Sequence, residues 1–187
     1  MPAKPKTRLR FTRSSSPRAA VVITVSDRCA RGEREDLSGP RVAALLARHG
    51  FEVVATALIP DRKRLIVHTL RAAAAAAALV VTTGGTGLGP RDVTPEATQV
   101  VVDRLAPGLS EAMRATGAAR ERRAWLSRGL AGVRGRSLIV NLPGSPAGAE
   151  ESLASILDLL PHALAVLSGG NAHPDVPAAN GGGSHAG

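Results

Sequence analysis

Aromatic residues and cysteine are scarce in this chain of 187 residues, and each scarcity excludes a class of protein. There is no tyrosine, and the only aromatic residues are Phe11, Phe51 and Trp125. The stacking platforms on which single-stranded nucleic-acid binders hold bases can therefore hardly form. Cys29 is the only cysteine, which excludes an intrachain disulfide and a cysteine-based zinc site and favours a reducing, cytoplasmic compartment.

Long apolar runs are missing, and so are acidic residues near the N-terminus. The longest strictly apolar run, residues 72–81, is too short to cross a bilayer, and we expect no membrane association. Residues 1–18 hold six basic side chains, no acid and no apolar core of a signal peptide. We predict a disordered basic tail at residues 1–18, one domain at residues 19–169 and a disordered Gly/Ala-rich tail at residues 170–187.

The net charge of +9 is concentrated in that N-terminal segment, so the predicted domain is only mildly basic. A mild positive charge suits an anionic small substrate as well as a polynucleotide. Hydrophobic residues make up 44% of the chain, which is enough for a sizeable core built from Ala, Val and Leu.

Strands and helices alternate along the predicted domain. Apolar, β-branched runs predict strands at residues 21–25, 51–58 and 79–81, and two further strands at 126–133 and 137–141 form a hairpin. Helices are expected between them, at residues 40–48, from 61 into the alanine run, 95–105, 109–116, 150–159 and 162–167. This order predicts an α/β fold with a mostly parallel sheet, an antiparallel hairpin at its edge and helices on both faces.

The strand at residues 79–81 is followed by a glycine-rich loop, Thr83-Gly84-Gly85-Thr86-Gly87. Glycines allow positive φ angles and let backbone N–H groups approach a ligand, so the loop can form an anion nest to which the threonine hydroxyls add donors. The loop has neither the dinucleotide-binding pattern nor the P-loop lysine, and a plain tight turn is the alternative. Asp92 lies between this loop and a helix that we expect Thr94 to cap, and an acid beside a phosphate site suggests a divalent cation.

Three other predicted strands also end in polar or rigid loops. These are Ser26-Asp27, Asp61 and Pro143-Gly144-Ser145. The carboxyl ends of parallel strands meet at one edge of a sheet, where ligands bind, so we expect the four loops to form one site. Asp61 has a simpler alternative role as the N-cap of the next helix.

Read together, these segments resemble one known family, the molybdopterin adenylyltransferases of the Mog/MoaB group, which are related to the G domains of gephyrin and the plant Cnx proteins. The resemblance covers residues 21–169. It rests on the ordered set Val25-Ser26-Asp27, Asp36–Pro40, Ile59-Pro60-Asp61, Thr83–Gly87, Arg91–Thr98, Leu126-Ser127-Arg128 and Asn141–Pro146.

The resemblance implies a three-layer α/β/α molybdopterin-binding fold, a homotrimer or hexamer, and transfer of AMP from MgATP to the terminal phosphate of molybdopterin. The product would pass to a separate molybdenum-insertion protein. Asp61 and Asp92 match the family's two essential acids, associated with Mg²⁺-nucleotide chemistry, and Thr83–Gly87 match its glycine-rich loop. Positions that match its contacts around the pterin phosphate are Ser26, Ser127, Asn141, Pro143, Gly144 and Ser145.

Two other functions stay open at this point. Some members of the group bind or assemble without demonstrated transferase activity, so a non-catalytic molybdopterin-binding paralogue is the first alternative. Gly117 also stands where some relatives place a hydroxyl that contacts substrate, and we assign it no role. Nucleic-acid binding through the basic tail is the second alternative, and the scarcity of aromatic residues makes it the least favoured.

Overall fold

A computed structural model of the chain describes residues 11–170. The expected tails at residues 1–18 and 170–187 lie largely outside this range, so their disorder stays a prediction. Residues 11–18 are irregular but make contacts: Phe11 packs against the core, and the Ser14 N–H donates a hydrogen bond of 2.9 Å to the Ala76 carbonyl. No helix in the described range is long and apolar enough to span a membrane.

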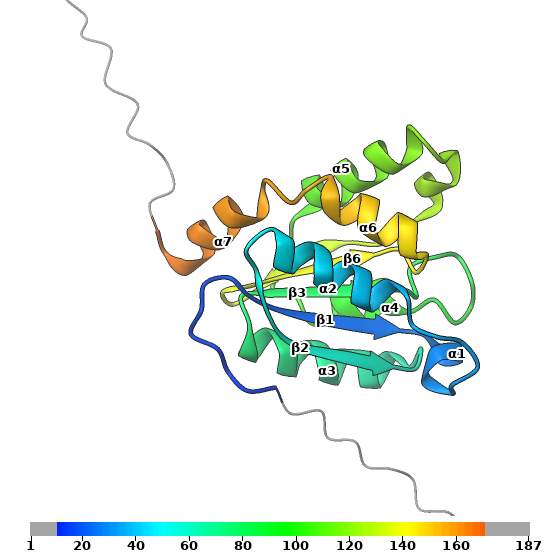
Figure 1. The fold of residues 1–187 in the computed structure, drawn as a ribbon, viewed down its shortest axis with the longest axis horizontal. Coiled ribbons are helices and arrows are strands. Elements are labelled where there is room, and N and C mark those ends of the chain that lie inside the picture. The colour runs from blue at the N-terminus through cyan, green and yellow to red at the C-terminus, as the bar shows by residue number, and fades with distance from the viewer. Residues whose placement is uncertain (1–10, 171–187) are drawn as a thin grey trace, which may run out of the picture.

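A six-stranded mixed sheet forms the centre of the molecule (Figure 1). Its order is β2-β1-β3-β6-β5-β4, in which β2, β1, β3 and β6 are parallel and β5 and β4 add antiparallel pairs at one end. The strands are β1 (Ala19–Val25), β2 (Glu52–Ile59), β3 (Leu79–Thr83), β4 (Arg104–Leu105), β5 (Ala131–Arg134) and β6 (Ser137–Leu142). The predicted parallel sheet and antiparallel hairpin are thus confirmed, with β4 as the outermost strand.

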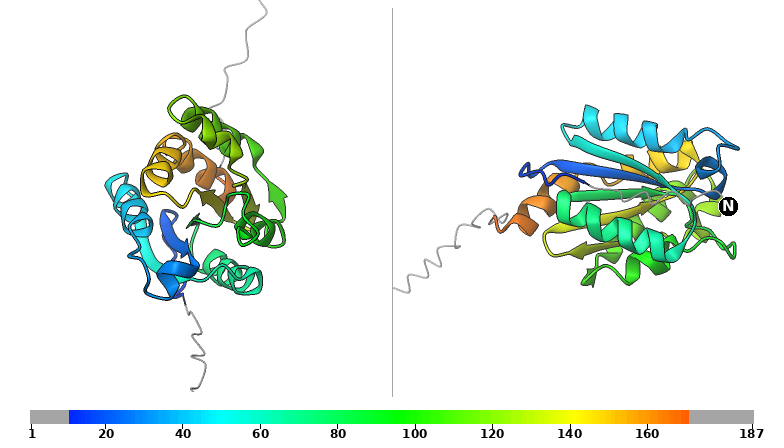
Figure 2. Two further views of the ribbon diagram at one scale, coloured as in Figure 1. Left: turned by 90° about the vertical axis from the view of Figure 1, so that its right-hand side faces the viewer. Right: turned by 90° about the horizontal axis from the view of Figure 1, so that it is seen from below.

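Helices cover both faces of this sheet (Figure 2). One face packs against α2 (Ser38–Arg48), α5 (Pro107–Ala118), α6 (Pro146–Ala154) and α7 (Leu160–Ser168), and the other against α3 (Lys63–Ala76) and α4 (Thr94–Gln99). Two short helices complete the described chain: α1 (Asp27–Ala30), which the sequence did not predict, and the 3₁₀ helix η1 (Arg122–Leu126).

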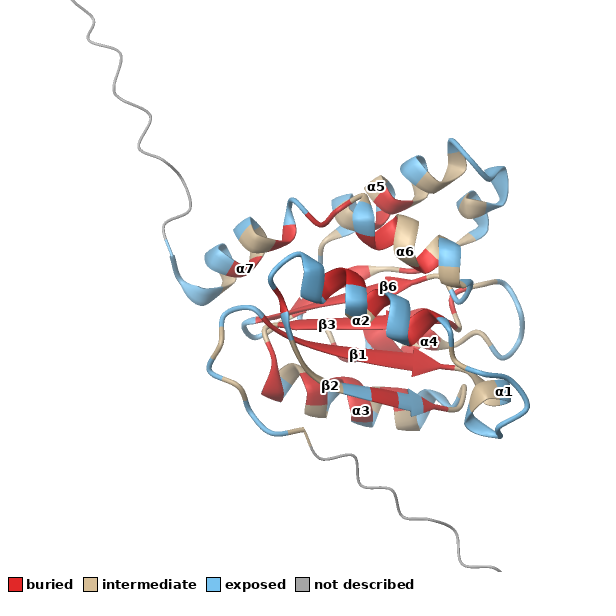
Figure 3. Ribbon diagram, viewed as in Figure 1, coloured by how far each residue is buried: buried red, intermediate tan, exposed pale blue. Residues whose placement is uncertain are grey.

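The central strands β1 and β3 are mostly apolar, with threonines near their carboxyl ends, because both of their faces are buried (Figure 3). In β1, Ala20 and Val22 belong to the core under α2, whereas Val21 and Ile23 belong to the core over α3. Every residue of β1 and β3 is buried, which explains the uninterrupted β-branched runs in the sequence. This rigid layer holds the loops at the carboxyl ends of its strands.

The helix predicted at residues 95–105 is much shorter in the structure. It ends at Gln99, and Arg104–Leu105 form β4, which pairs with β5. Two physical causes favour this ending. Residues 100–102 are three valines, which are β-branched and weaken a helix, and the edge of β5 offers hydrogen-bond partners such as the Val133 carbonyl, 2.7 Å from the Asp103 nitrogen.

Two predicted helix caps are also wrong. Thr94 is the first residue of α4 rather than its cap, and its buried hydroxyl has no hydrogen-bond partner. Helix α3 begins at Lys63 after Arg62, so Asp61 does not cap it. Both side chains are instead directed at the loops described next. Pro95 and Glu96 do lie in the first turn of α4, as predicted.

Candidate active site

The four polar loops expected at one edge of the sheet do meet there. They follow β1, β2, β3 and β6, whose last residues are in register, with Val25 beside Ile59 and Thr83 beside Leu142. In Figure 1 the arrowheads of β1 and β2 point toward this edge, where α1 also lies. The parallel register therefore brings together segments that are more than one hundred residues apart in the chain.

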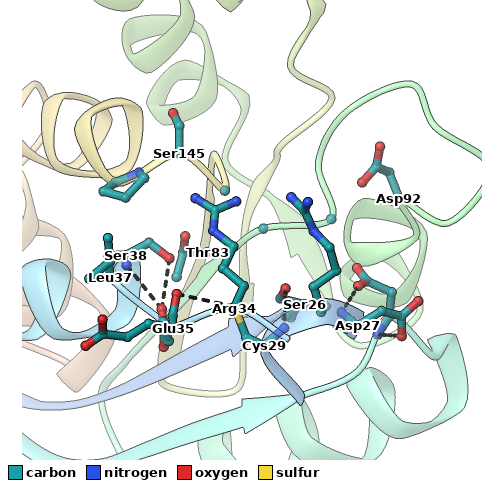
Figure 4. Close-up of a pocket in the computed structure, with 18 of the residues that line it drawn as sticks. Ser26, Asp27, Cys29, Arg34, Glu35, Leu37, Ser38, Thr83, Asp92 and Ser145 are labelled. Atoms are coloured by element: carbon teal, nitrogen blue, oxygen red, sulfur yellow. Dashed lines mark hydrogen bonds between the residues drawn. The ribbon is translucent and has the colours of Figure 1, made fainter. Parts of the chain in front are cut away.

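A cleft of about 440 Å³ opens between these loops (Figure 4). In Figure 4, Ser26 and Asp27 lie on one side of the cleft, and Asp92 and Ser145 lie on the other. We call this the first cleft. Its lining includes Ser26, Asp27, Arg28, Cys29, Arg34, Asp36, Ser38, Asp61, Thr83, Gly84, Gly85, Arg91, Asp92, Gly144 and Ser145.

Asp27 and Asp61 hold each other by a reciprocal pair of hydrogen bonds. The Asp27 N–H donates to Asp61 Oδ2 at 2.6 Å, and the Asp61 N–H donates to Asp27 Oδ1 at 3.1 Å. The Asp61 carboxylate is thereby fixed against the loop after β1, which explains why it does not cap α3. Ser26 contributes locally, since its hydroxyl accepts the Cys29 N–H and caps α1.

The two carboxyls of this pair are shifted in opposite directions. Partial burial opposes ionisation of Asp27, but hydrogen bonds from Arg91, at 2.6 and 2.9 Å, and from the Asp61 N–H lower its pKa. Burial raises the pKa of Asp61, and the nearby carboxylates of Asp27 and Asp92 raise it further. Asp61 therefore lies in a field of like charge that a bound cation would relieve.

The glycine-rich loop brings its backbone close to these carboxylates. Gly84 and Gly85 have φ angles of +99° and +63°, which side-chain-bearing residues rarely adopt. A Cβ atom on Gly85 would collide with the Thr94 hydroxyl and lie 2.9 Å from Asp61 Oδ1. Glycine is required here both for the turn and for the close approach. The hydroxyl of Thr83 donates to the Pro143 carbonyl at 2.7 Å and so ties two of the loops together.

Asp61 and Asp92 fit a magnesium ion that is held in part by substrate oxygens. Within residues 11–170, no group of three His, Cys, Asp or Glu side chains is placed to bind a metal by itself. Magnesium commonly binds one or two carboxylates together with substrate phosphates. The raised pKa of Asp61 and the unpartnered, buried hydroxyl of Thr94 beside Gly85 are consistent with such an ion at this point.

A second cleft, of about 430 Å³, lies on the other side of the Pro143–Ser145 loop. Gly144 and Ser145 line both clefts, so this loop is their common wall. The surface of the second cleft is more apolar than that of the first. It is lined by Thr86, Gly87, Gly117, Glu121, Arg123, Ala124, Leu126, Ser127, Pro143, Gly148, Glu151 and Ser152, together with the two shared residues.

The residues proposed from the sequence divide between these clefts, with one exception. Ser26, Asp27, Asp61, Thr83, Gly84, Gly85 and Asp92 line the first cleft, and Thr86, Gly87, Ser127 and Pro143 line the second. Asn141 lines neither, because it is 1% exposed and donates hydrogen bonds of 3.0 Å to the Thr82 and Thr98 hydroxyls. It lies beside a cavity of about 30 Å³ beneath the second cleft.

Sequence reasoning gave no role to the arginines of the first cleft. Arg28 and Arg34 lie on or after α1, the helix that was not predicted, and Arg91 reaches Asp27 from 64 residues away. Asp36 was quoted only as part of a motif, yet its carboxylate accepts the N–H groups of Ser38 and Gly39 at the start of α2. The sequence offered one local signal for these residues: Arg28, Arg34 and Asp36 follow soon after the buried strand that ends at Val25, and Asp is typical of a turn there.

Comparison with known proteins identifies the family to which the chain belongs. Residues 21–162 match the family model described as "Probable molybdopterin binding domain", which is most of the chain. The protein belongs to this molybdopterin-binding family. Both clefts and all four loops lie within the matched range.

Relatives within the molybdopterin-binding family agree in sequence and in structure. A protein of Helicobacter pylori J99 named molybdopterin adenylyltransferase is 38% identical over 157 residues, which cover 79% of this chain and 86% of that protein. A crystal structure of the molybdopterin biosynthesis enzyme MoaB of Thermus thermophilus is 50% identical, with a TM-score of 0.77. That match covers 81% of this chain and 96% of the other.

Other relatives are longer proteins. The molybdenum cofactor biosynthesis bifunctional protein of Synechococcus elongatus is 40% identical over 151 residues, which cover 80% of this chain. The match spans 47% of that relative, so the present chain corresponds to about half of its length.

Proposed function

We propose that this protein is a molybdopterin adenylyltransferase of molybdenum cofactor biosynthesis, which transfers AMP from MgATP to the terminal phosphate of molybdopterin. The observation that carries the proposal is the pair of adjoining clefts, of which the first holds Asp61 and Asp92 and the second is more apolar. Relatives named molybdopterin adenylyltransferase, at 38–40% identity, support the same conclusion.

We assign the nucleotide to the first cleft and the pterin to the second. The guanidinium groups of Arg28 and Arg34 line the first cleft and suit the oxygens of a triphosphate. The pterin is a flat ring system with a phosphate arm, and it suits the more apolar cleft in which Ser127 lies. Across the shared wall at Gly144 and Ser145, the pterin phosphate would meet the α-phosphate of the nucleotide.

The reaction requires positioning and charge neutralisation rather than a protein nucleophile. An oxygen of the pterin phosphate forms a new bond to the α-phosphorus, and the bond from that phosphorus to the β-bridging oxygen breaks. The electron pair leaves with pyrophosphate. A magnesium ion, when bound, would neutralise the triphosphate and the leaving group. Asp61 and Asp92 would hold that ion, and Gly84 and Gly85 leave room for the phosphates.

The assembly and the pathway position remain predictions. We expect a homotrimer or a hexamer in the cytoplasm that passes adenylylated molybdopterin to a molybdenum-insertion protein. Exposed apolar side chains that a subunit interface could cover are Val100, Leu105, Trp125 and Leu126. Light scattering on a sizing column would measure the number of subunits.

The experiment that tests the activity is a turnover assay with molybdopterin, ATP and Mg²⁺. Asp61→Asn and Asp92→Asn should each lower pyrophosphate release at least about a hundredfold, as expected for the loss of a group that neutralises transition-state charge. Asp103→Asn is the matched control, because its carboxylate accepts only the Gly135 N–H, away from both clefts. Pterin binding without AMP transfer in the wild type would refute the enzyme and leave the non-catalytic binding protein.

A further inference from the structure

Arg128 makes three hydrogen bonds to backbone carbonyls of the loop that carries Asp92. Its own N–H donates to the Thr86 carbonyl at 2.9 Å. Its side chain donates from Nε to the Gly87 carbonyl at 2.7 Å and from Nη2 to the Asp92 carbonyl at 2.5 Å. The guanidinium therefore bridges the loop from Gly87 to Asp92, and the backbone N–H of Arg128 adds a contact at Thr86.

The third guanidinium nitrogen of Arg128 is also used within the protein. Nη1 pairs with the carboxylate of Glu96 in the first turn of α4. The arginine fork is thus divided between two carbonyls and one carboxylate, so each of its three nitrogens already has an acceptor within the protein. A lysine ammonium in its place could not reach the same three acceptors from one point.

Few other contacts hold this loop to the rest of the described molecule. Asp92 and Gly89 bond to each other in both directions, at 2.9 and 3.0 Å, but these bonds lie within the loop. Leu88 is 67% exposed, and the Arg91 guanidinium that pairs with Asp27 is itself 63% exposed, so solvent weakens that attachment. The half-buried guanidinium of Arg128 is the main attachment.

We propose that Arg128 is the positioning residue for Asp92: it sets where that carboxylate lies in the first cleft without contacting substrate itself. The proposal rests on the proposed function for its catalytic consequence. Arg128 also directly follows Ser127, which lines the second cleft. The same residue therefore links the wall of the pterin cleft to the acid of the nucleotide cleft.

Hydrogen–deuterium exchange on the unliganded protein tests this role without reference to activity. In Arg128→Lys, which keeps the charge but loses the fork, the hydrogen-bonded amides of this loop, those of Gly89 and Asp92, should exchange about tenfold faster or more, while the strands keep their protection. Arg134→Lys is the matched control, since Arg134 likewise donates to a backbone carbonyl, that of Val101, at 2.9 Å. It should leave residues 87–92 unchanged.

Kinetics then separate positioning from binding. Arg128→Lys should lower kcat about tenfold or more and change the KM for ATP by less than about threefold, and Glu96→Gln should show a smaller effect of the same kind. Unchanged exchange at residues 87–92, an unchanged kcat, or faster exchange spread over the whole chain in both variants would each overturn the proposal. If the wild type shows no AMP transfer, the proposed function fails, and the exchange measurement alone decides whether Arg128 places the loop.

Discussion

Replacing Gly85 by alanine should destabilise the protein more than the same change at Gly135, although both glycines have left-handed backbones. Their φ angles are +63° and +55°. An added Cβ at Gly135 meets nothing within 4 Å, whereas at Gly85 it collides with the Thr94 hydroxyl and lies 2.9 Å from Asp61 Oδ1. The pair of variants therefore separates backbone strain from steric overlap.

The expected magnitudes follow from these two contributions. A left-handed conformation costs a residue with a side chain about 1–2 kcal/mol, which is the whole expected effect at Gly135. Overpacking of a tight site adds about 1–3 kcal/mol at Gly85, so Gly85→Ala should cost about 2–5 kcal/mol in total. Thr94→Ala removes the hydroxyl that the new methyl meets, and in the double variant it should recover about 1–2 kcal/mol.

Urea unfolding of the four variants would measure these differences from the midpoints at constant slope. Pyrophosphate release should fall strongly in Gly85→Ala and stay near the wild-type rate in Gly135→Ala, which lies outside both clefts. Equal destabilisation at the two glycines, or no coupling between Gly85 and Thr94, would show that the loop can move aside and would refute the reasoning.

Two further measurements address charge and polarity beneath the site. The pKa of Asp61 in the folded protein is raised above its ordinary value of 3.8. Between pH 3.8 and that raised pKa, the folded state binds more protons than the unfolded state. The free energy of unfolding therefore falls as the pH rises through this window. Asp61→Asn should therefore raise Tm at pH 7, and the gain should shrink as the pH falls toward 4; a constant difference in Tm would contradict this. Asn141→Ala should cost about 1–3 kcal/mol in urea unfolding, because it leaves its hydrogen-bonding partners in the core unsatisfied, and an unchanged midpoint would contradict that estimate.

The sheet and the edge at which the site lies could be predicted because their signals are local. Buried parallel strands require uninterrupted β-branched runs, as in Val21–Val25, and the bend after Thr83 requires glycine. The chain order of these segments then fixes the edge where the loops meet. Their positions after strands placed Asp61 and Asp92 at this edge, whereas their choice as a pair of site residues came from the family resemblance.

The contacts that organise the site could not be predicted in this way. Asp61 looked like a helix cap because its partner, Asp27, lies 34 residues away in the chain. Arg128 looked like part of a motif because its acceptor at Gly87 is 41 residues away. Likewise, the sequence after Val100 did not indicate that Arg104 and Leu105 would form a strand paired with β5 instead of continuing the helix.

The loop that separates the two clefts limits how this protein can change. Gly144 packs so closely on the glycine-rich loop that a Cβ there would lie 3.2 Å from the Gly84 Cα. A substitution at Gly144 or Ser145 should therefore alter the space in both clefts at once. On the proposed function, selectivity for the nucleotide can be adjusted independently at residues that line only the first cleft, such as Arg34–Ser38. Selectivity for the pterin can be adjusted at residues that line only the second, such as Gly117–Ser127. The loop at Gly144 and Ser145 should therefore vary little between related enzymes, and sequence variation should accumulate at residues that line only one of the two clefts.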